Sequence, residues 1–286
     1  MLHSVANMKV AIELCLLLCL SSLCHAQMRE GTAAVPGARL HYRDSGGDGV
    51  PVLLLHAVGG TSESFENQFP ALAGKGYRVI AYDRRGFGQT TFDAGADPGT
   101  QAGDLAAFLD VLGLDRVHLI GTATGGIVAL DFALSYPSRL RTLVIANSVG
   151  SLSDPEIAAI RHRLALPQGL RIPMEFMELS PAYRAANPEG TKHWIEVKDR
   201  NSTAAHLPAP QPFRSSLTLA SLETIQVPTL LIGGGADMTA PAPLQELLAA
   251  HLRTAKLTIL PDVGHSAYWE EPDKFNNAVL AFIKEH

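Results

Sequence analysis

Short apolar runs alternate with helical patterns along most of this 286-residue chain, and this alternation constrains the fold most strongly. Several runs are continuously apolar, as expected of strands buried on both faces of a parallel sheet. Strands that alternate with helices predict an α/β fold with a mostly parallel, doubly wound sheet. The predicted strands are 33–35, 40–43, 52–56, 78–82, 117–121, 142–146, 229–232 and 256–260. The predicted helices between them are 61–74, 99–112, 125–136, 242–252 and 272–284.

Residues 151–226 break this rhythm. They show helical patterns and eight prolines but no clear buried strand, and they are far too long for a plain loop. We therefore predict a helical lid inserted between two parts of one core, residues 27–150 and 227–286. Apolar lid residues are predicted to line a substrate pocket, and the alternative is that they pack the lid on the sheet. The residues assigned to the pocket are Met174, Phe176, Met177 and Trp194.

Residues 1–26 have the layout of a secretory signal peptide. Lys9 gives a positive start, residues 10–20 are largely apolar, and a small residue precedes Gln27. The predicted mature protein is exported, periplasmic or secreted, and its core carries no thiol. An uncleaved anchor, a lipoprotein signal and a later start codon are the alternatives. All three cysteines lie in this leader, at Cys15, Cys19 and Cys24, which excludes a disulfide scaffold, a Cys-based zinc site and a cysteine nucleophile in the core.

Composition excludes several further classes of function. The hydrophobic share of 47% is too high for a disordered chain. A net charge of −5 supplies no global basic field for nucleic acid. Once the leader is removed, no stable membrane span is expected. The spacing of the histidines indicates no metal site, so no cofactor is predicted. The expected partner is an apolar small-molecule substrate, and the sequence leaves the oligomeric state open.

Five short motifs follow predicted strands in a fixed order. They are His56-Ala57-Val58-Gly59-Gly60, Asp83-Arg84-Arg85-Gly86-Phe87-Gly88, Gly121-Thr122-Ala123-Thr124-Gly125-Gly126, Gly235-Ala236-Asp237-Met238-Thr239 and Asp262-Val263-Gly264-His265-Ser266. Together they resemble the α/β-hydrolase superfamily across residues 31–286, in the branch of lidded esterases, C–C hydrolases and haloperoxidases. The resemblance implies an α/β-hydrolase fold: a mostly parallel eight-stranded sheet flanked by helices, with an inserted helical lid.

One position departs from the family pattern. The family's nucleophile elbow is G-x-S-x-G, a strained turn that raises the nucleophile above the sheet. Here the elbow is Gly121-Thr122-Ala123-Thr124-Gly125, so alanine occupies the nucleophile position. The glycines are expected to relieve crowding where the helix crosses the strand. The resemblance implies that Asp237 orients His265 as the base. It also implies an oxyanion hole formed by the backbone N–H groups of Val58 and Thr124.

A methyl group cannot attack a carbonyl, and three explanations of Ala123 remain open. The alanine is an engineered replacement of serine, or His265 activates a water directly, or the dyad performs lyase or decarboxylase chemistry. Two relatives that carry alanine here, a bacterial aminoacrylate hydrolase and the plant methylketone synthases, illustrate the second and third routes. This chain resembles them only in that departure, and an exported protein fits neither pathway. A fourth possibility lies outside catalysis: an inactive protein that binds a small apolar ligand under its lid.

Other polar residues near the motifs are expected to be structural. His56 closes a buried strand and is predicted to hold its loop through hydrogen bonds. Asp83, Arg84 and Arg85 are predicted to form a structural turn whose arginines pair with carboxylates or solvent. Thr124 follows Ala123 directly, but its side chain is not expected at the apex of the elbow.

Overall fold

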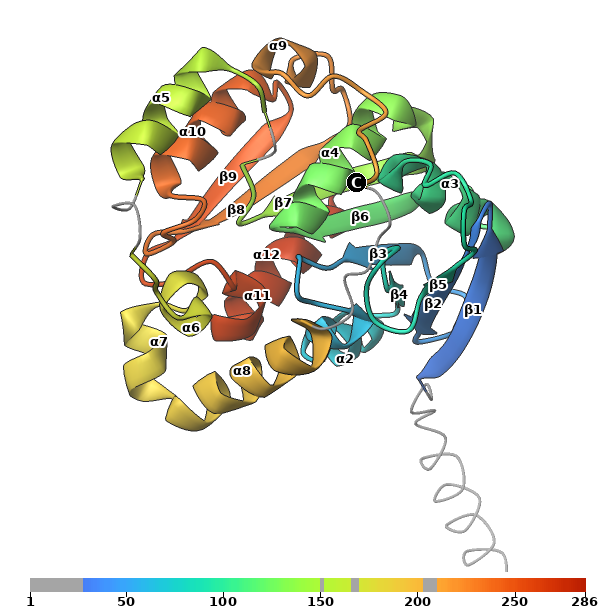
Figure 1. Cartoon of the computed structure of the whole chain (residues 1–286), viewed down its shortest axis with the longest axis horizontal. Helices are drawn as coiled ribbons and strands as arrows, with labels where there is room; N and C mark the ends of the chain where they lie inside the picture. Colours follow the sequence, from blue (N-terminus) through green and yellow to red (C-terminus); the bar gives the residue numbers. More distant parts are fainter. Residues whose placement is uncertain (1–27, 150–151, 166–169, 203–209) are drawn as a thin grey trace, which may run out of the picture.

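The computed structural model describes residues 28–149, 152–165, 170–202 and 210–286. The predicted leader and its three cysteines lie outside these ranges. Within them, the chain forms one central sheet with helices on both faces (Figure 1). In order across the sheet, the strands are β1 (Arg29–Val35), β2 (Ala38–Asp44), β4 (Arg78–Tyr82), β3 (Pro51–Leu55), β6 (Val117–Thr122), β7 (Leu140–Ala146), β8 (Thr229–Gly234) and β9 (Ala255–Leu260).

The sheet is antiparallel at one edge and parallel elsewhere. β1 pairs with β2, and β2 with β4, in antiparallel register, whereas all pairings from β4 through β9 are parallel. The predicted α/β-hydrolase fold is confirmed, as are the eight predicted strands. Sequence reasoning missed β5 (Thr91–Phe92), a two-residue strand that pairs with β2. Two residues are too few to show a period.

The strands carry two separate layers of core. Along β3, Leu53 and Leu55 belong to one hydrophobic cluster while Val52 and Leu54 belong to the other, because successive side chains of a strand point to opposite faces. The first cluster contains α3, α4 and α10, and the second contains α2, α11 and α12 (Figure 1). These helices are α2 (Gln68–Ala73), α3 (Gln101–Val111), α4 (Thr124–Ser135), α10 (Ala242–His251), α11 (Ala267–Glu270) and α12 (Pro272–Lys284).

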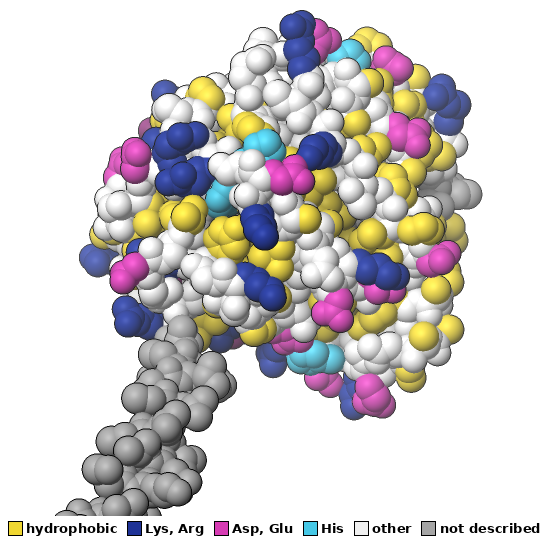
Figure 2. Space-filling view, turned by 180° about the vertical axis from the view of Figure 1, so that it is seen from behind, with side chains coloured by type: hydrophobic (Ala, Val, Ile, Leu, Met, Phe, Trp, Pro, Cys, Tyr) yellow, Lys and Arg dark blue, Asp and Glu magenta, His cyan; other side chains and the backbone are white. Residues whose placement is uncertain are grey.

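Between β7 and β8 the described residues form helices and connecting segments but no strand. The helices are α5 (Pro155–Leu164), α6 (Met174–Glu178), α7 (Pro181–Ala186), α8 (Pro188–Ser202) and α9 (Leu219–Leu222). None of the helices within the described ranges is long and apolar enough to cross a bilayer. On the face shown in Figure 2, basic and acidic side chains are interspersed with apolar ones.

Candidate active site

The backbone at Ala123 has the strained conformation of a nucleophile elbow. Ala123 stands between β6 and α4 with φ 48° and ψ −116°, a conformation that costs a non-glycine residue on the order of 1–3 kcal/mol. The flanking glycines are required sterically. A Cβ on Gly121 would lie 2.4 Å from the carbonyl oxygen of Gly125, and one on Gly125 would lie 2.2 Å from that of Leu55. The predicted relief of crowding between strand and helix is therefore confirmed.

The structure brings Asp237 and His265 together from the ends of two neighbouring strands. Asp237 follows β8 and His265 follows β9. His265 Nδ1 lies 2.9 Å from Asp237 Oδ2 and 3.1 Å from Oδ1, and both residues are buried. Asp237 Oδ1 also accepts the N–H groups of Thr239 and Ala240, each at 2.8 Å. The Asp237 carboxylate therefore accepts hydrogen bonds both from the turn that follows it and from the His265 ring.

A third residue, Asn147, completes this hydrogen-bonded group. Its Nδ2 donates to Asp237 Oδ2 at 3.1 Å and to the carbonyl oxygen of Gly264 at 3.0 Å. Burial opposes ionisation of Asp237, but hydrogen bonds from His265 and Asn147 and the imidazole charge keep the pKa of its carboxyl below the ordinary value. Sequence analysis missed Asn147. The available signal was a polar residue directly after buried strand β7.

The junction between α6 and α7 is hydrogen-bonded to the loop that carries His265. The carbonyl oxygen of Glu178 accepts the N–H groups of His265 at 2.7 Å and Ser266 at 3.1 Å. The Glu270 carboxylate accepts the N–H groups of Gly264 at 3.0 Å and Ser180 at 3.1 Å. Burial raises the pKa of Glu270 above its ordinary value. These contacts fix the position of His265 relative to α6 and α7. Sequence reasoning predicted neither Glu178 nor Glu270.

The predicted oxyanion side contains an arrangement that the sequence did not reveal. The backbone N–H of Val58 donates to Thr124 Oγ1 at 2.7 Å, and Arg84 Nη2 donates to the same oxygen at 3.2 Å. Arg84 Nη1 donates to Gln101 Oε1 at 2.6 Å. The Val58 amide predicted for the oxyanion hole is thus engaged by a side chain.

His56 has the predicted structural role. Its Nδ1 lies 2.7 Å from the carbonyl oxygen of Ala57, and its Nε2 accepts the N–H of Arg84 at 2.9 Å. Burial and the charge of Arg84 lower the pKa of His56 well below its ordinary value, so the ring is neutral. The Nδ1 contact lies within the loop after β3, and the Nε2 contact joins this loop to the loop after β4.

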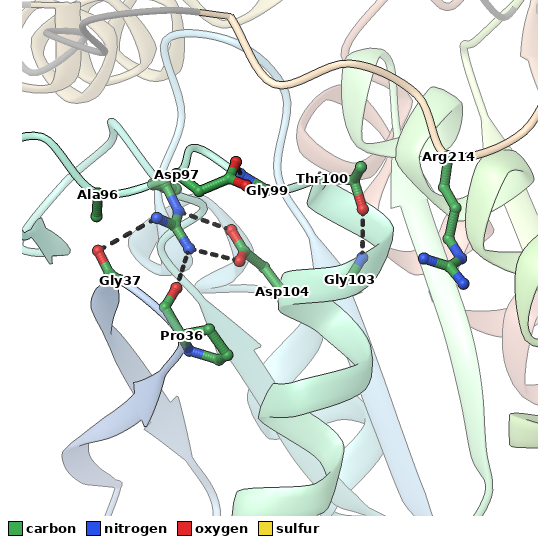
Figure 3. Close-up of a pocket in the computed structure, with 10 residues that line it drawn as sticks. Pro36, Gly37, Ala96, Asp97, Gly99, Thr100, Gly103, Asp104 and Arg214 are labelled. Carbon is green, nitrogen blue, oxygen red and sulfur yellow. Dashed lines mark hydrogen bonds and ion pairs between the residues drawn. The ribbon is translucent and has the colours of Figure 1, made fainter.

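The two adjacent arginines differ, which corrects the prediction that treated them alike. Arg85 forms a buried ion pair with Asp104 at 2.7 Å and donates to the carbonyl oxygens of Pro36 and Gly37. Figure 3 shows these contacts in the wall of a cavity of about 380 Å³. Arg84 is also buried, yet within the described ranges no carboxylate forms an ion pair with it. Both arginines lie beyond the end of β4, where the chain enters a turn at Arg85, and their side chains meet different surroundings.

A smaller cavity of about 290 Å³ lies over the elbow. Ala123 and His265 both line it, and Arg161 contributes from lid helix α5. The other described lining residues are Thr124, Ile127, Asn147, Ser148, Val149, Thr239 and Ala240. In the described part of the chain, no group of three or more His, Cys, Asp or Glu side chains is arranged to hold a metal ion.

The four lid residues predicted to line the pocket do not line this cavity. Met174 and Phe176 are exposed, and Phe176 stacks with the Arg184 guanidinium at 3.9 Å. Met177 is half-buried, and Trp194 of α8 packs in the second core cluster. Trp194 therefore follows the alternative of packing lid on core. Contact between the other three and a substrate stays a prediction.

A model of the alpha/beta hydrolase family matches residues 52–278. The chain belongs to this family. Among its relatives is RutD of Variovorax paradoxus, named as a carbamate hydrolase, which is 32% identical over 255 residues covering 85% of this chain and 96% of the relative.

Two further relatives place the chain among hydrolases. A 2-hydroxy-6-oxononadienedioate/2-hydroxy-6-oxononatrienedioate hydrolase of Burkholderia vietnamiensis is 30% identical and covers 86% of this chain and 91% of its own. A solved thermophilic esterase from Thermogutta terrifontis is 27% identical, with a TM-score of 0.71 over 91% of this chain and 99% of that one. The family supports assignment of the chain as a hydrolase.

Proposed function

We propose that the protein hydrolyses a small ester, lactone or related carbonyl compound by general-base activation of water, without a covalent intermediate. One observation carries the proposal: Ala123 and an Asp237-oriented His265 line the same cavity. A methyl at the apex leaves room beside the base for a water molecule where the nucleophilic oxygen of relatives would lie. His265 then acts on that water instead of on a serine hydroxyl.

The chemical step follows from the orientation of the imidazole. Asp237 holds Nδ1, which leaves Nε2 of the neutral ring to accept a proton. The water oxygen attacks the carbonyl carbon, its proton passes to Nε2, and the carbonyl oxygen becomes an oxyanion. The oxyanion then reforms the carbonyl as the bond to the leaving group breaks, and Nε2 gives the proton to that group; Asp237 stabilises the transient imidazolium. The positive end of helix α4, which begins at Thr124, favours the developing negative charge.

The retained strain at Ala123 favours an active protein over a purely binding one. A ligand-binding fold has no use for a strained apex at φ 48° or for a buried, oriented base. Loss of one triad member in serine hydrolases leaves catalysis of about 10³–10⁴-fold from the remaining groups, which suffices for a reactive substrate.

The test measures turnover of a panel of small esters, lactones and β-keto acids by the parent and by His265→Gln. Hydrolysis of an ester or lactone that disappears in the variant supports the proposal. Turnover of β-keto acids alone would identify a decarboxylase instead, and binding without turnover would identify a receptor.

We further propose that the protein acts outside the cytoplasm after removal of residues 1–26. The support is the signal-peptide layout of the sequence and the restriction of every cysteine to that segment. Mass mapping of protein recovered from outside the cytoplasm is expected to find an N-terminus near Gln27. An intact Met1 or Met8 on that protein would contradict export by cleavage.

A further inference from the structure

The hydroxyl of Thr124 has an unusual set of hydrogen bonds. Its Oγ1 accepts two of them, from the backbone N–H of Val58 at 2.7 Å and from Arg84 Nη2 at 3.2 Å. A threonine hydroxyl has two lone pairs and one proton. With both lone pairs engaged, the hydroxyl has only its proton left to contribute. Among the described residues, no acceptor takes that proton.

Thr124 lies where a hydrogen-bond donor can reach a substrate carbonyl. It directly follows Ala123 and lines the cavity that Ala123 and His265 share. Its oxygen also occupies the position facing the Val58 amide, where the family resemblance places the substrate oxyanion. A substrate carbonyl bound beside Ala123 therefore meets the Thr124 hydroxyl in front of that amide.

Arg84 makes this hydroxyl a stronger donor. Arg84 is 2% exposed, and its Nε has no hydrogen-bond partner among the described residues. Burial lowers the pKa of Arg84 to about 10, so it remains charged at neutral pH. No described carboxylate neutralises it, in contrast to Arg85, which Asp104 neutralises. A buried positive charge that donates to a hydroxyl oxygen draws electron density from the O–H bond.

We propose that the Thr124 hydroxyl is the oxyanion donor of this protein, polarised by Val58 and Arg84. The inference rests on the proposed function in that the substrate carries a carbonyl group. The carbonyl oxygen accepts the hydrogen bond from Thr124 Oγ1–H, and the bond shortens as negative charge develops on that oxygen. The proton stays on Thr124 throughout. Val58 and Arg84 touch no substrate and act as positioning residues.

The experiment uses the full chain with Ala123→Ser, whose serine is acylated by 4-nitrophenyl acetate. Adding Thr124→Val removes the hydroxyl at nearly constant volume, and adding Thr124→Ser keeps it. We expect Thr124→Val to slow acylation about 100-fold, the effect of removing one oxyanion donor, and Thr124→Ser to stay within about fivefold. Thermal unfolding of each variant shows that the fold persists.

Arg84→Gln in the same background tests the polarising charge. We expect kcat to fall about tenfold, because a charge-assisted hydrogen bond becomes a neutral one, while KM stays unchanged. A purely structural role for Arg84 would instead change the unfolding temperature and KM.

Three results would overturn the proposal. Acylation by Thr124→Val at or above the rate of the single variant would show that the hydroxyl blocks the Val58 amide. Loss of rate in Thr124→Ser equal to that in Thr124→Val would show a packing role. A folded Ala123→Ser protein that does not react at all would show that no oxyanion donor serves this apex. Since acylation of the serine requires no water attack, these results are distinct from failure of the proposed hydrolysis by the parent.

Discussion

The two walls of the active site are built differently. On the base side, Asp237 accepts hydrogen bonds from Asn147, from two backbone N–H groups and from the His265 ring. On the elbow side, the apex holds a methyl group, and the neighbouring Thr124 hydroxyl collects donors from a loop amide and a buried guanidinium. The first wall follows the pattern that the family resemblance implies, and the second departs from it.

The difference shows which parts of such a site depend on one another. The base side needs several partners because a buried carboxylate and imidazole are costly unless they are hydrogen-bonded. The elbow side keeps its shape through backbone geometry, the flanking glycines and the hydrogen bonds to Thr124 Oγ1. None of these involves the side chain at the apex, so that side chain is free to change. A site that loses its nucleophile can therefore retain an oriented base and a strained turn.

The largest expected loss of activity comes from replacing His265, the base itself. His265→Gln removes the proton acceptor and is expected to reduce any hydrolysis by at least about 10³-fold, with the far-UV circular dichroism unchanged. His251→Gln is the matched control, since His251 also pairs with a carboxylate, Glu223 at 2.8 Å, but lies outside the site. Activity of the His265 variant within about twofold of the parent would remove the dyad from the mechanism.

The second prediction concerns a nucleophile placed at the apex of the elbow. Ala123→Ser is expected to place an Oγ within reach of His265 and to give esterase activity on small aryl esters with a pre-steady-state burst. The rate is expected to exceed that of the parent by about 10²-fold, because the strained turn and the oriented base already exist. The variant is also expected to be labelled by an aryl phosphonate, and the parent is not.

The control for this gain is the double variant Ala123→Ser with His265→Gln, in which labelling is expected to be lost. A singly substituted protein that folds normally yet resists the phosphonate would show that position 123 is not the apex of a functional elbow.

A smaller loss of activity is expected when Asn147, which is hydrogen-bonded to Asp237, is replaced. Asn147→Ala removes one hydrogen bond to Asp237 and one to the carbonyl oxygen of Gly264. We expect about a tenfold fall in kcat, since a hydrogen bond to a charged group contributes about 1.5–3 kcal/mol. Asn276→Ala, which removes a buried asparagine bonded to Gln68 and Asn67 instead, is expected to leave kcat unchanged. Equal effects of the two variants would assign Asn147 to stability alone.

The smallest expected effect is on stability, through the pH dependence of two buried carboxyls. The folded-state pKa of Asp237 is lowered from 3.8, so its contribution is fully present above about pH 3.8 and is lost as pH falls through the folded pKa. The folded-state pKa of Glu270 is raised from 4.5, so stability falls as pH rises from 4.5 through the folded pKa. The two carboxyls thus act in opposite directions.

Denaturant unfolding of Asp237→Asn and Glu270→Gln between pH 2 and 7, a window of about five units that spans both reference values, measures these slopes. Asp237→Asn is expected to flatten the loss of stability in acid. Glu270→Gln is expected to remove the decline that begins above about pH 4.5. Slopes that match the parent in both variants would show that neither carboxyl is coupled to folding.

Sequence reasoning succeeded where the signal is local. Strands such as β3 and β6 are continuous apolar runs between turn residues, so their existence follows from hydropathy and length. The elbow was recognisable because two glycines flank Ala123 at fixed spacing. The pairing of Asp237 with His265 was implied by the resemblance of the ordered motifs to those of the α/β-hydrolase family.

What the sequence by itself determined is therefore the layered α/β architecture, while the elbow and the acid–base pair were implied by short motifs that resemble those of a known family. Only the tertiary structure decided how the site is supported: Thr124 meets Arg84 across 40 residues, and Asn147 meets Asp237 across 90. Such contacts leave no periodic trace, because a hydrogen bond between distant loops depends on where the sheet places each loop. Arg84 and Arg85 are adjacent in the chain and chemically identical, and only folding gave one a carboxylate and the other a hydroxyl.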